Sequence, residues 1–136
     1  MKHLLTLLML SLSHIGFAQI ISVNDSSSPE SEYGPEELIK KVMIKSSCSS
    51  ADNFSFQVNG SQSSLTSKSY GYFKRPVGST FPFEEGVILT TGIAFPAGNI
   101  IANERVDHDN GDAGDLDLEA ALGQGGTRDA TFIKFN

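Results

Sequence analysis

A cluster of acidic residues is the part of this sequence best equipped for chemistry. Calcium takes roughly six to eight oxygen ligands from carboxylates and backbone carbonyls, and Gly111 and Gly114 would let the backbone turn so that carbonyls could join the carboxylates. Seven carboxylates fall between residues 104 and 119, where Arg105 is the only basic residue: Glu104, Asp107, Asp109, Asp112, Asp115, Asp117 and Glu119. The predicted calcium ligands are Asp107, Asp109, Asp112, Asp115 and Asp117.

Two structural interpretations compete with calcium binding. The block does not follow the EF-hand spacing, because a loop that starts at Asp107 has its glycine, Gly111, at the fifth position rather than the sixth. A solvated acidic loop that aids solubility would need no ion at all. Asp115 could instead accept backbone hydrogen bonds as the N-cap of the helical turn that follows it.

Catalytic motifs are absent from the sequence. Asp115 could pair with Asp117 or Glu119 as the two carboxylates of a glycosidase, but the chain has no Trp to stack against a sugar. It has no Gly-x-Ser-x-Gly elbow, phosphate-binding loop or His-Glu-x-x-His motif. His108 lacks a second His or Cys as a zinc partner, so we interpret it as a loop residue. We predict no catalytic residue, with a secreted hydrolase as the alternative.

The N-terminal residues have the pattern of an export signal. Lys2 and His3 precede an apolar stretch, and Gly16 and Ala18 are the small residues of a cleavage site. We predict that residues 1–18 are a signal peptide, cleaved between Ala18 and Gln19, and that the protein is secreted or held at the cell surface. No apolar run is long enough for a transmembrane helix.

Charge and cysteine content narrow the partners further. The chain has 10 Lys+Arg against 16 Asp+Glu. Cleavage would remove Lys2 and leave 9 − 16 = −7, which argues against a nucleic-acid partner. Cys48 is the single cysteine, and a lone cysteine in an exported chain is either a buried free thiol or half of a disulfide. Because the chain also ends inside a predicted interior strand, 129–136, we expect the disulfide partner of Cys48 to lie beyond Asn136.

The elements around these residues are mostly short strands. Pro35 as a first helical residue, Glu36 and Glu37 in the first turn, and an i,i+4 apolar face predict a helix over Pro35–Ile44. Alternating or β-branched residues predict strands near 54–58, 69–73, 86–91 and 129–136, with an Asn59-Gly60 hairpin turn after the first. A helical turn, 116–122, ends at Gly123. The predicted fold is mainly β, an antiparallel β-sandwich-like domain with one N-terminal helix, incomplete at its C-terminus.

Several motifs together carry a family resemblance. They are Tyr33-x-Pro35-Glu36-Glu37-Leu38, Phe81-Pro82-Phe83-x-x-Gly86-Val87-Ile88-Leu89-Thr90-Thr91-Gly92, Gly114-Asp115-x-Asp117-Leu118 and Asp129-Ala130-Thr131-x-Ile133-x-Phe135. This order resembles the start of the bacterial choice-of-anchor L domain. Members are exported surface proteins joined to varied C-terminal anchors, often type IX secretion signals. Because the resemblance falls on Asp115 and Asp117, these two are the favoured calcium ligands.

The resemblance implies an organisation and a function. We expect a signal peptide at 1–18, a serine-rich, weakly ordered leader at 19–32, and the N-terminal part of a choice-of-anchor L-like domain at 33–136. The expected function is an exported, non-catalytic binding or adhesion-type module of a larger bacterial protein, whose ligand is an extracellular polysaccharide or surface protein. The alternatives are a fragment of a secreted carbohydrate-active or other hydrolytic enzyme, and a structural spacer domain.

Overall fold

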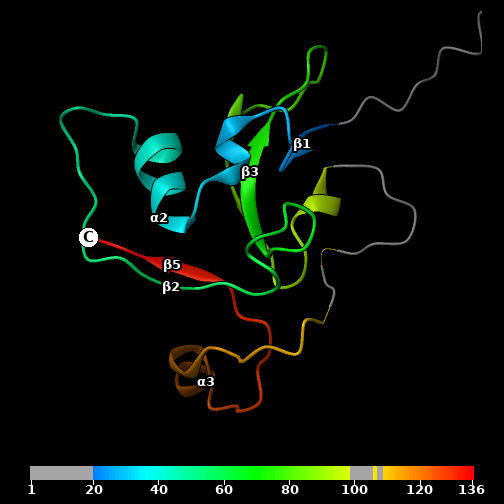
Figure 1. Cartoon of the computed structure of the whole chain (residues 1–136). Helices are drawn as coiled ribbons and strands as arrows, with labels where there is room; N and C mark the ends of the chain where they lie inside the picture. The colour runs from blue at the N-terminus through cyan, green and yellow to red at the C-terminus, as the bar shows by residue number, and fades with distance from the viewer. Residues whose placement is uncertain (1–19, 99–105, 107–108) are drawn as a thin grey trace, which may run out of the picture.

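The computed structural model describes residues 20–98, 106 and 109–136, and these form a mainly β domain (Figure 1). Its strands are β1 (Ser22–Val23), β2 (Ser55–Gln57), β3 (Tyr70–Lys74), β4 (Glu85–Leu89) and β5 (Phe132–Lys134). One antiparallel sheet has the order β1-β3-β4, and β2 pairs with β5 in a second antiparallel sheet. The predicted mainly β class is confirmed, and two antiparallel sheets are consistent with a sandwich-like domain.

The helical elements are short. They are η1 (Pro29–Glu32), α2 (Pro35–Leu38), η2 (Ile39–Ile44), η3 (Phe95–Ala97) and α3 (Leu116–Leu122). Together α2 and η2 span the predicted helix, although its second half is π-helical. Within the described residues, no helix has the length and apolar character that crossing a membrane requires.

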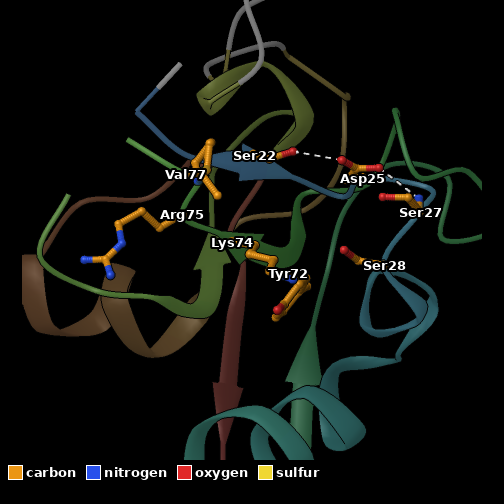
Figure 2. A pocket seen from close by; sticks show the side chains of 9 residues that line it. Ser22, Asp25, Ser27, Ser28, Tyr72, Lys74, Arg75 and Val77 are labelled. Carbon is orange, nitrogen blue, oxygen red and sulfur yellow. Dashed lines mark hydrogen bonds between the residues drawn. The ribbon is translucent and has the colours of Figure 1, made fainter. Parts of the chain in front are cut away.

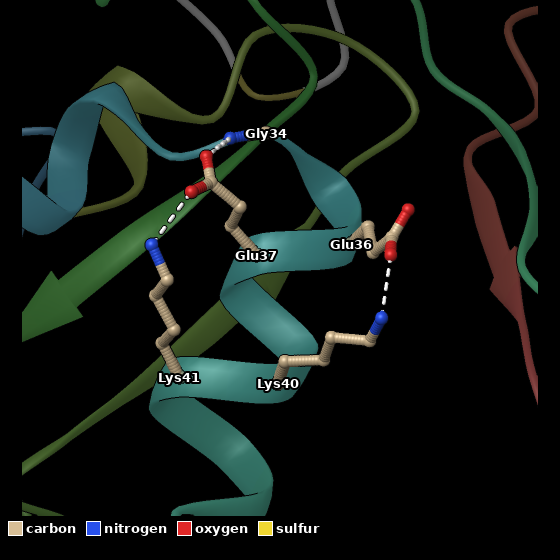
Figure 3. Close-up of polar contacts among 5 residues, drawn as sticks. All are labelled: Gly34, Glu36, Glu37, Lys40 and Lys41. Carbon is tan, nitrogen blue, oxygen red and sulfur yellow. Dashed lines mark hydrogen bonds and ion pairs between the residues drawn. The ribbon is translucent and has the colours of Figure 1, made fainter. Parts of the chain in front are cut away.

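Ion pairs one turn apart support the exposed face of α2 and η2 (Figure 3). The Glu36 and Lys40 side chains lie 2.6 Å apart, and those of Glu37 and Lys41 lie 2.7 Å apart. The Glu37 carboxylate also accepts a hydrogen bond from the Gly34 backbone N–H at 3.5 Å. Such exposed pairs stabilise a helix only slightly, so most of its stability must come from the opposite face.

The apolar core joins this helix to the central strand. Leu38 and Val42 are buried against Tyr70 and Tyr72 of β3. Partly buried apolar residues pack around this cluster: Tyr33, Val58 and Val87. Because the cluster is small, buried polar side chains make up much of the remaining interior: Asn24, Ser31, Asn59, Lys68, Ser69 and Asp129.

Part of the predicted leader is packed into the domain, which differs from our expectation for 19–32. It contains β1 and η1, and Val23, Asn24 and Ser31 are buried. Asn24 follows β1 in the left-handed region with φ 50°, a conformation that asparagine tolerates. Its backbone N–H donates to the Tyr72 carbonyl at 2.9 Å, so β1 is held to β3 by more than its two strand residues.

The tight hairpin turn predicted at Asn59-Gly60 is absent, and a longer loop takes its place. Asn59 and Gly60 pair antiparallel with Ser69 and Lys68, directly before β3, whereas β2 itself pairs with β5, near the other end of the sequence. The Asn59 carboxamide donates to the Ala130 carbonyl at 2.9 Å and to the Thr131 hydroxyl at 3.2 Å. Asn59 therefore connects two segments that are distant in sequence, which a local turn signal does not reveal.

Two predicted strands are shorter and more exposed than expected. The strand predicted as buried at 86–91 is β4, whose residues are half-buried or exposed. The strand predicted as interior at 129–136 is β5, which covers only Phe132–Lys134 and is partly exposed. Both are edge strands of their sheets in the described part of the chain, and this explains their exposure despite their apolar sequences.

Lys68 is the least expected buried residue. Its side chain is 1% exposed, and its Nζ donates to the Ser31 carbonyl at 2.6 Å. Nζ also lies 4.8 Å from the centre of the Tyr70 ring, a cation–π contact. Burial lowers the pKa of the Lys68 ammonium because desolvation disfavours its charged form.

This burial predicts a pH-dependent stability. Between the lowered pKa of folded Lys68 and its unfolded value of about 10.4, the unfolded chain binds more protons, so Lys68 makes stability rise with pH. In Lys68→Met that contribution is absent, and wild type should gain stability relative to the variant as the pH approaches 10. Burial raises the pKa of Tyr70 and Tyr72 and acts in the opposite direction, but both proteins share this effect. Urea unfolding from pH 7 to 10.5 measures the difference, and parallel curves would contradict the prediction.

Candidate functional site

Hydrogen bonds within the acidic block and to neighbouring segments hold it in place. Asp109 accepts a hydrogen bond from the Gly111 N–H at 2.8 Å. The Asp112 carboxylate accepts one from the Gly60 N–H at 3.2 Å. Asp107 lies outside the described residues. Asp109 and Asp112, two of the predicted calcium ligands, therefore accept backbone hydrogen bonds that fix the loop.

The acids around α3 also have structural partners. Asp115 caps the helix, since its Oδ1 accepts from the N–H groups of Asp117 at 2.9 Å and Leu118 at 3.2 Å, which confirms the N-cap interpretation. Asp117 pairs with Lys134 of β5 at 2.6 Å, and this contact lowers the pKa of the Asp117 carboxyl. Glu119 accepts from both the backbone N–H and the hydroxyl of Thr127.

Asp129 is an acidic residue whose role the sequence pattern missed. Asp129 is buried, and its backbone lies in the left-handed region with φ 53°. Its two carboxylate oxygens accept from the backbone N–H groups of Asn110 at 3.0 Å and Asp112 at 2.8 Å. Its sequence signals were its place in the Asp129-Ala130-Thr131 family motif and an aspartate at the start of a predicted strand, where such a residue is unfavourable. Asp129 fastens the acidic block to the segment that leads into β5.

The predicted acids do not gather into a metal-binding cluster in the described part of the chain. Within it, no group of three or more His, Cys, Asp or Glu side chains is placed to hold an ion. Asp107 and His108 fall outside it. Calcium binding by this block therefore stays a prediction.

Two substitutions at Asp115 separate its capping role from ion binding. Asp115→Ala should lower the free energy of unfolding by about 1 kcal/mol, because two backbone donors lose their acceptor. Asp115→Asn should keep nearly full stability without calcium, since asparagine caps equally well. Thermal unfolding checks both. If Asp115 is also a calcium ligand, millimolar calcium will raise the melting temperature of wild type but not of Asp115→Asn/Asp117→Asn. Equal losses for Ala and Asn would contradict the capping role.

Cys48 is exposed and free in the described structure. It follows η2, in a serine-rich turn where its N–H donates to the Ser46 hydroxyl at 3.0 Å. Its exposure leaves the thiol accessible to a disulfide partner. The predicted pairing of Cys48 with a cysteine beyond Asn136 stays a prediction.

A polar cleft lies beside β1 and the end of β3 (Figure 2). Its volume is about 310 Å³. Ser22 and Lys74 are cross-strand partners in the β1–β3 pair, so the sheet brings a hydroxyl and an ammonium to the same place. The lining residues are Ser22, Asp25, Ser27, Ser28, Tyr72, Lys74, Arg75, Pro76 and Val77.

Charge in this cleft is only partly compensated. Asp25 accepts from the Ser27 N–H at 2.8 Å and the Ser22 hydroxyl at 3.4 Å, and the hydrogen bonds from Ser27 are the main cause of its lowered pKa. Lys74 is exposed, and no described carboxylate lies within 4.0 Å of its ammonium. Its cross-strand neighbour Glu85 instead forms an ion pair with Lys45 and accepts a hydrogen bond from the Tyr72 hydroxyl.

A second hollow of about 430 Å³ adjoins the first. The two share the segment from Lys74 to Val77, and the second adds Gly78, Ser79 and Glu84. Arg75 is oriented by its bond to the Phe81 carbonyl at 2.9 Å and by Glu84 at 3.4 Å. None of these residues stands out in the sequence, because the serine-rich leader and the end of a strand become neighbours only in the fold.

Comparison with known proteins adds a family. The residues of the cleft, the core and the acidic block all lie within one match, to the family model described as the choice-of-anchor L domain, over residues 22–136. No curated protein and no solved structure matched the chain. This family suggests a surface-anchored module of a larger bacterial protein, at the cell surface or outside the cell. The resemblance carried by the Phe81–Gly92 and Gly114–Leu118 motifs is confirmed, and the chain belongs to the choice-of-anchor L domain family.

Proposed function

We propose that this chain is an exported, non-catalytic binding module that holds a hydroxyl-rich extracellular ligand, a polysaccharide, in the cleft beside β1. Its family suggests a place at the bacterial surface, where such polymers are the surroundings of the protein. The observation that carries the proposal is the cleft itself.

The lining of the cleft supports a sugar-like ligand. Ser22, Ser27 and Ser28 present hydroxyls, which both donate and accept hydrogen bonds. Asp25 adds an acceptor for sugar hydroxyls, and Lys74 adds a donor. A volume of about 310 Å³ lies at the lower end of the range of small-molecule sites, roughly 300–1,000 Å³, and suits one or two sugar rings.

The export part of the proposal rests on the sequence at Gly16 and Ala18. N-terminal sequencing of the exported protein should find Gln19 as the first residue, and protease added to intact cells should digest the protein. A surface fraction that still begins at Met1 would remove the export claim.

Binding is tested by filling the cleft. Ser27→Phe places a bulky ring at an exposed position of the lining, and Ser63→Phe is the matched control at an exposed serine outside it. On an array of bacterial and algal polysaccharides, wild type and the control should bind the same polymer, and Ser27→Phe should lose most of that binding. Absence of binding by wild type would favour the spacer alternative, and release of shortened sugars would favour the hydrolase.

A further inference from the structure

We propose that the ligand of this cleft is an acidic polysaccharide, a polymer of carboxylated sugars whose carboxylate pairs with Lys74. The inference rests on the proposed function and names its ligand class.

Lys74 is set apart from the other described lysines. Four of them form ion pairs with Asp or Glu: Lys40, Lys41, Lys45 and Lys134. A fifth, Lys68, is buried. Lys74 is the only exposed lysine in the described ranges without an ion pair, and it lies in the wall of a cleft. The Asp25 carboxylate acts on this ammonium only from beyond ion-pair distance. In a chain of net charge −6, an exposed ammonium without an ion pair favours an anionic group in the ligand.

The remaining lining favours a sugar acid over a simple anion. Asp25 stays ionised because hydrogen bonds, chiefly from Ser27, lower its pKa, so it needs hydrogen-bond donors, which a sugar supplies and a sulfate ion does not. The same carboxylate accepts hydrogen bonds from sugar hydroxyls. A ligand that carries both hydroxyls and a carboxylate satisfies Asp25 and Lys74 at once, and Ser22 neighbours both of these residues.

The second hollow favours a polymer over a single sugar. It lies next to the first across the segment from Lys74 to Val77. Its own polar groups include the Arg75 guanidinium, the Ser79 hydroxyl and the Glu84 carboxylate. A chain of several residues can occupy both hollows, whereas one ring fills only one of them.

The experiment compares two polymers and three proteins. Polygalacturonate and neutral dextran are titrated into the full exported protein by calorimetry, at low and at high salt. The variants are Lys74→Gln and, as a matched control, Arg128→Gln, which removes an exposed cation outside both hollows. Lys74→Gln should weaken polygalacturonate binding about tenfold, the loss expected for a hydrogen bond to a charged group. It should also reduce the salt dependence, and Arg128→Gln should leave both unchanged.

Each other outcome is informative. Equal binding of dextran and polygalacturonate, unaffected by Lys74→Gln, would overturn the acidic ligand and leave the binding function intact. An equal loss in Arg128→Gln would show non-specific attraction and overturn the role of Lys74. Galacturonic acid and its tetramer are titrated in the same way, and equal affinity for the two would overturn the claim that the ligand is a polymer. No binding of any polysaccharide by wild type would overturn the proposed function itself. Unchanged melting temperatures of both variants establish that the comparison is between folded proteins.

Discussion

Gly71→Ala is expected to destabilise the domain by about 3 kcal/mol, a large part of the stability of a small domain. A Cβ atom at Gly71 would lie 1.9 Å from Oδ1 of Asn24. That oxygen accepts the Tyr72 N–H, while Nδ2 of Asn24 donates to the Leu65 and Tyr70 carbonyls. The carboxamide therefore cannot retreat without breaking buried hydrogen bonds. Urea unfolding measures the loss.

Two comparisons make the Gly71 prediction specific. Gly125→Ala is the matched control, because the nearest atom to its new Cβ is 3.8 Å away, and it should change stability little. In an Asn24→Ala background the obstructing carboxamide is gone, so adding Gly71→Ala should destabilise the domain much less than it does in wild type. Additive losses in the double variant would show that the two side chains do not meet.

Asn24→Ala should by itself destabilise the domain by about 3 kcal/mol. Asn24 is 1% exposed, and the substitution leaves the Tyr72 N–H and the Leu65 and Tyr70 carbonyls without their side-chain partner. Unpaired buried polar groups are expensive because they have also lost water. Urea unfolding checks the size of the effect, and faster hydrogen exchange at the Tyr72 amide checks its place.

Asn53→Ala is the control for backbone strain at Asn24. Asn53 has φ 53°, close to the φ of 50° at Asn24, but it is exposed. Replacing it should destabilise by only about 1 kcal/mol, the penalty of a left-handed non-glycine residue. If both variants lost the same stability, the left-handed conformation and not the buried hydrogen bonds would account for the Asn24 effect.

The sequence was sufficient for the elements whose signals are local. The helix over Pro35–Ile44 was predicted from its first-turn acids and apolar spacing, and the structure has it with the same bounds. Asp115 was recognised as a candidate N-cap from its place before an apolar helical turn, and Gly123 as the end of that turn. The aromatic strand at 69–73 appears as β3, shifted by one residue. In each case the residues that set the conformation lie within a few positions of one another.

For the two edge strands, the local sequence pattern predicts that the element is a strand but does not predict how far it is buried. Apolar residues in 86–91 and 129–136 correctly predicted a strand within each range, yet β4 and β5 are shorter than predicted and partly exposed. Burial depends on what covers the two faces and the edge of a strand, and that is a property of the whole sheet. The predicted calcium block shows the same limit, since most of its described acids accept backbone or lysine hydrogen bonds.

By itself, the sequence determined the mainly β class, the helix and the family, and it offered the N-cap as one of two roles for Asp115. Only the tertiary structure decided that β2 pairs with β5, that Asn24 binds Tyr72 across 48 residues of sequence, and that Ser22 and Lys74 meet in one cleft. The physical reason is that strand pairing and polar burial depend on contacts between distant segments. Hydrophobic periodicity and turn residues act over only a few positions. They therefore do not indicate which distant segment a strand will pair with.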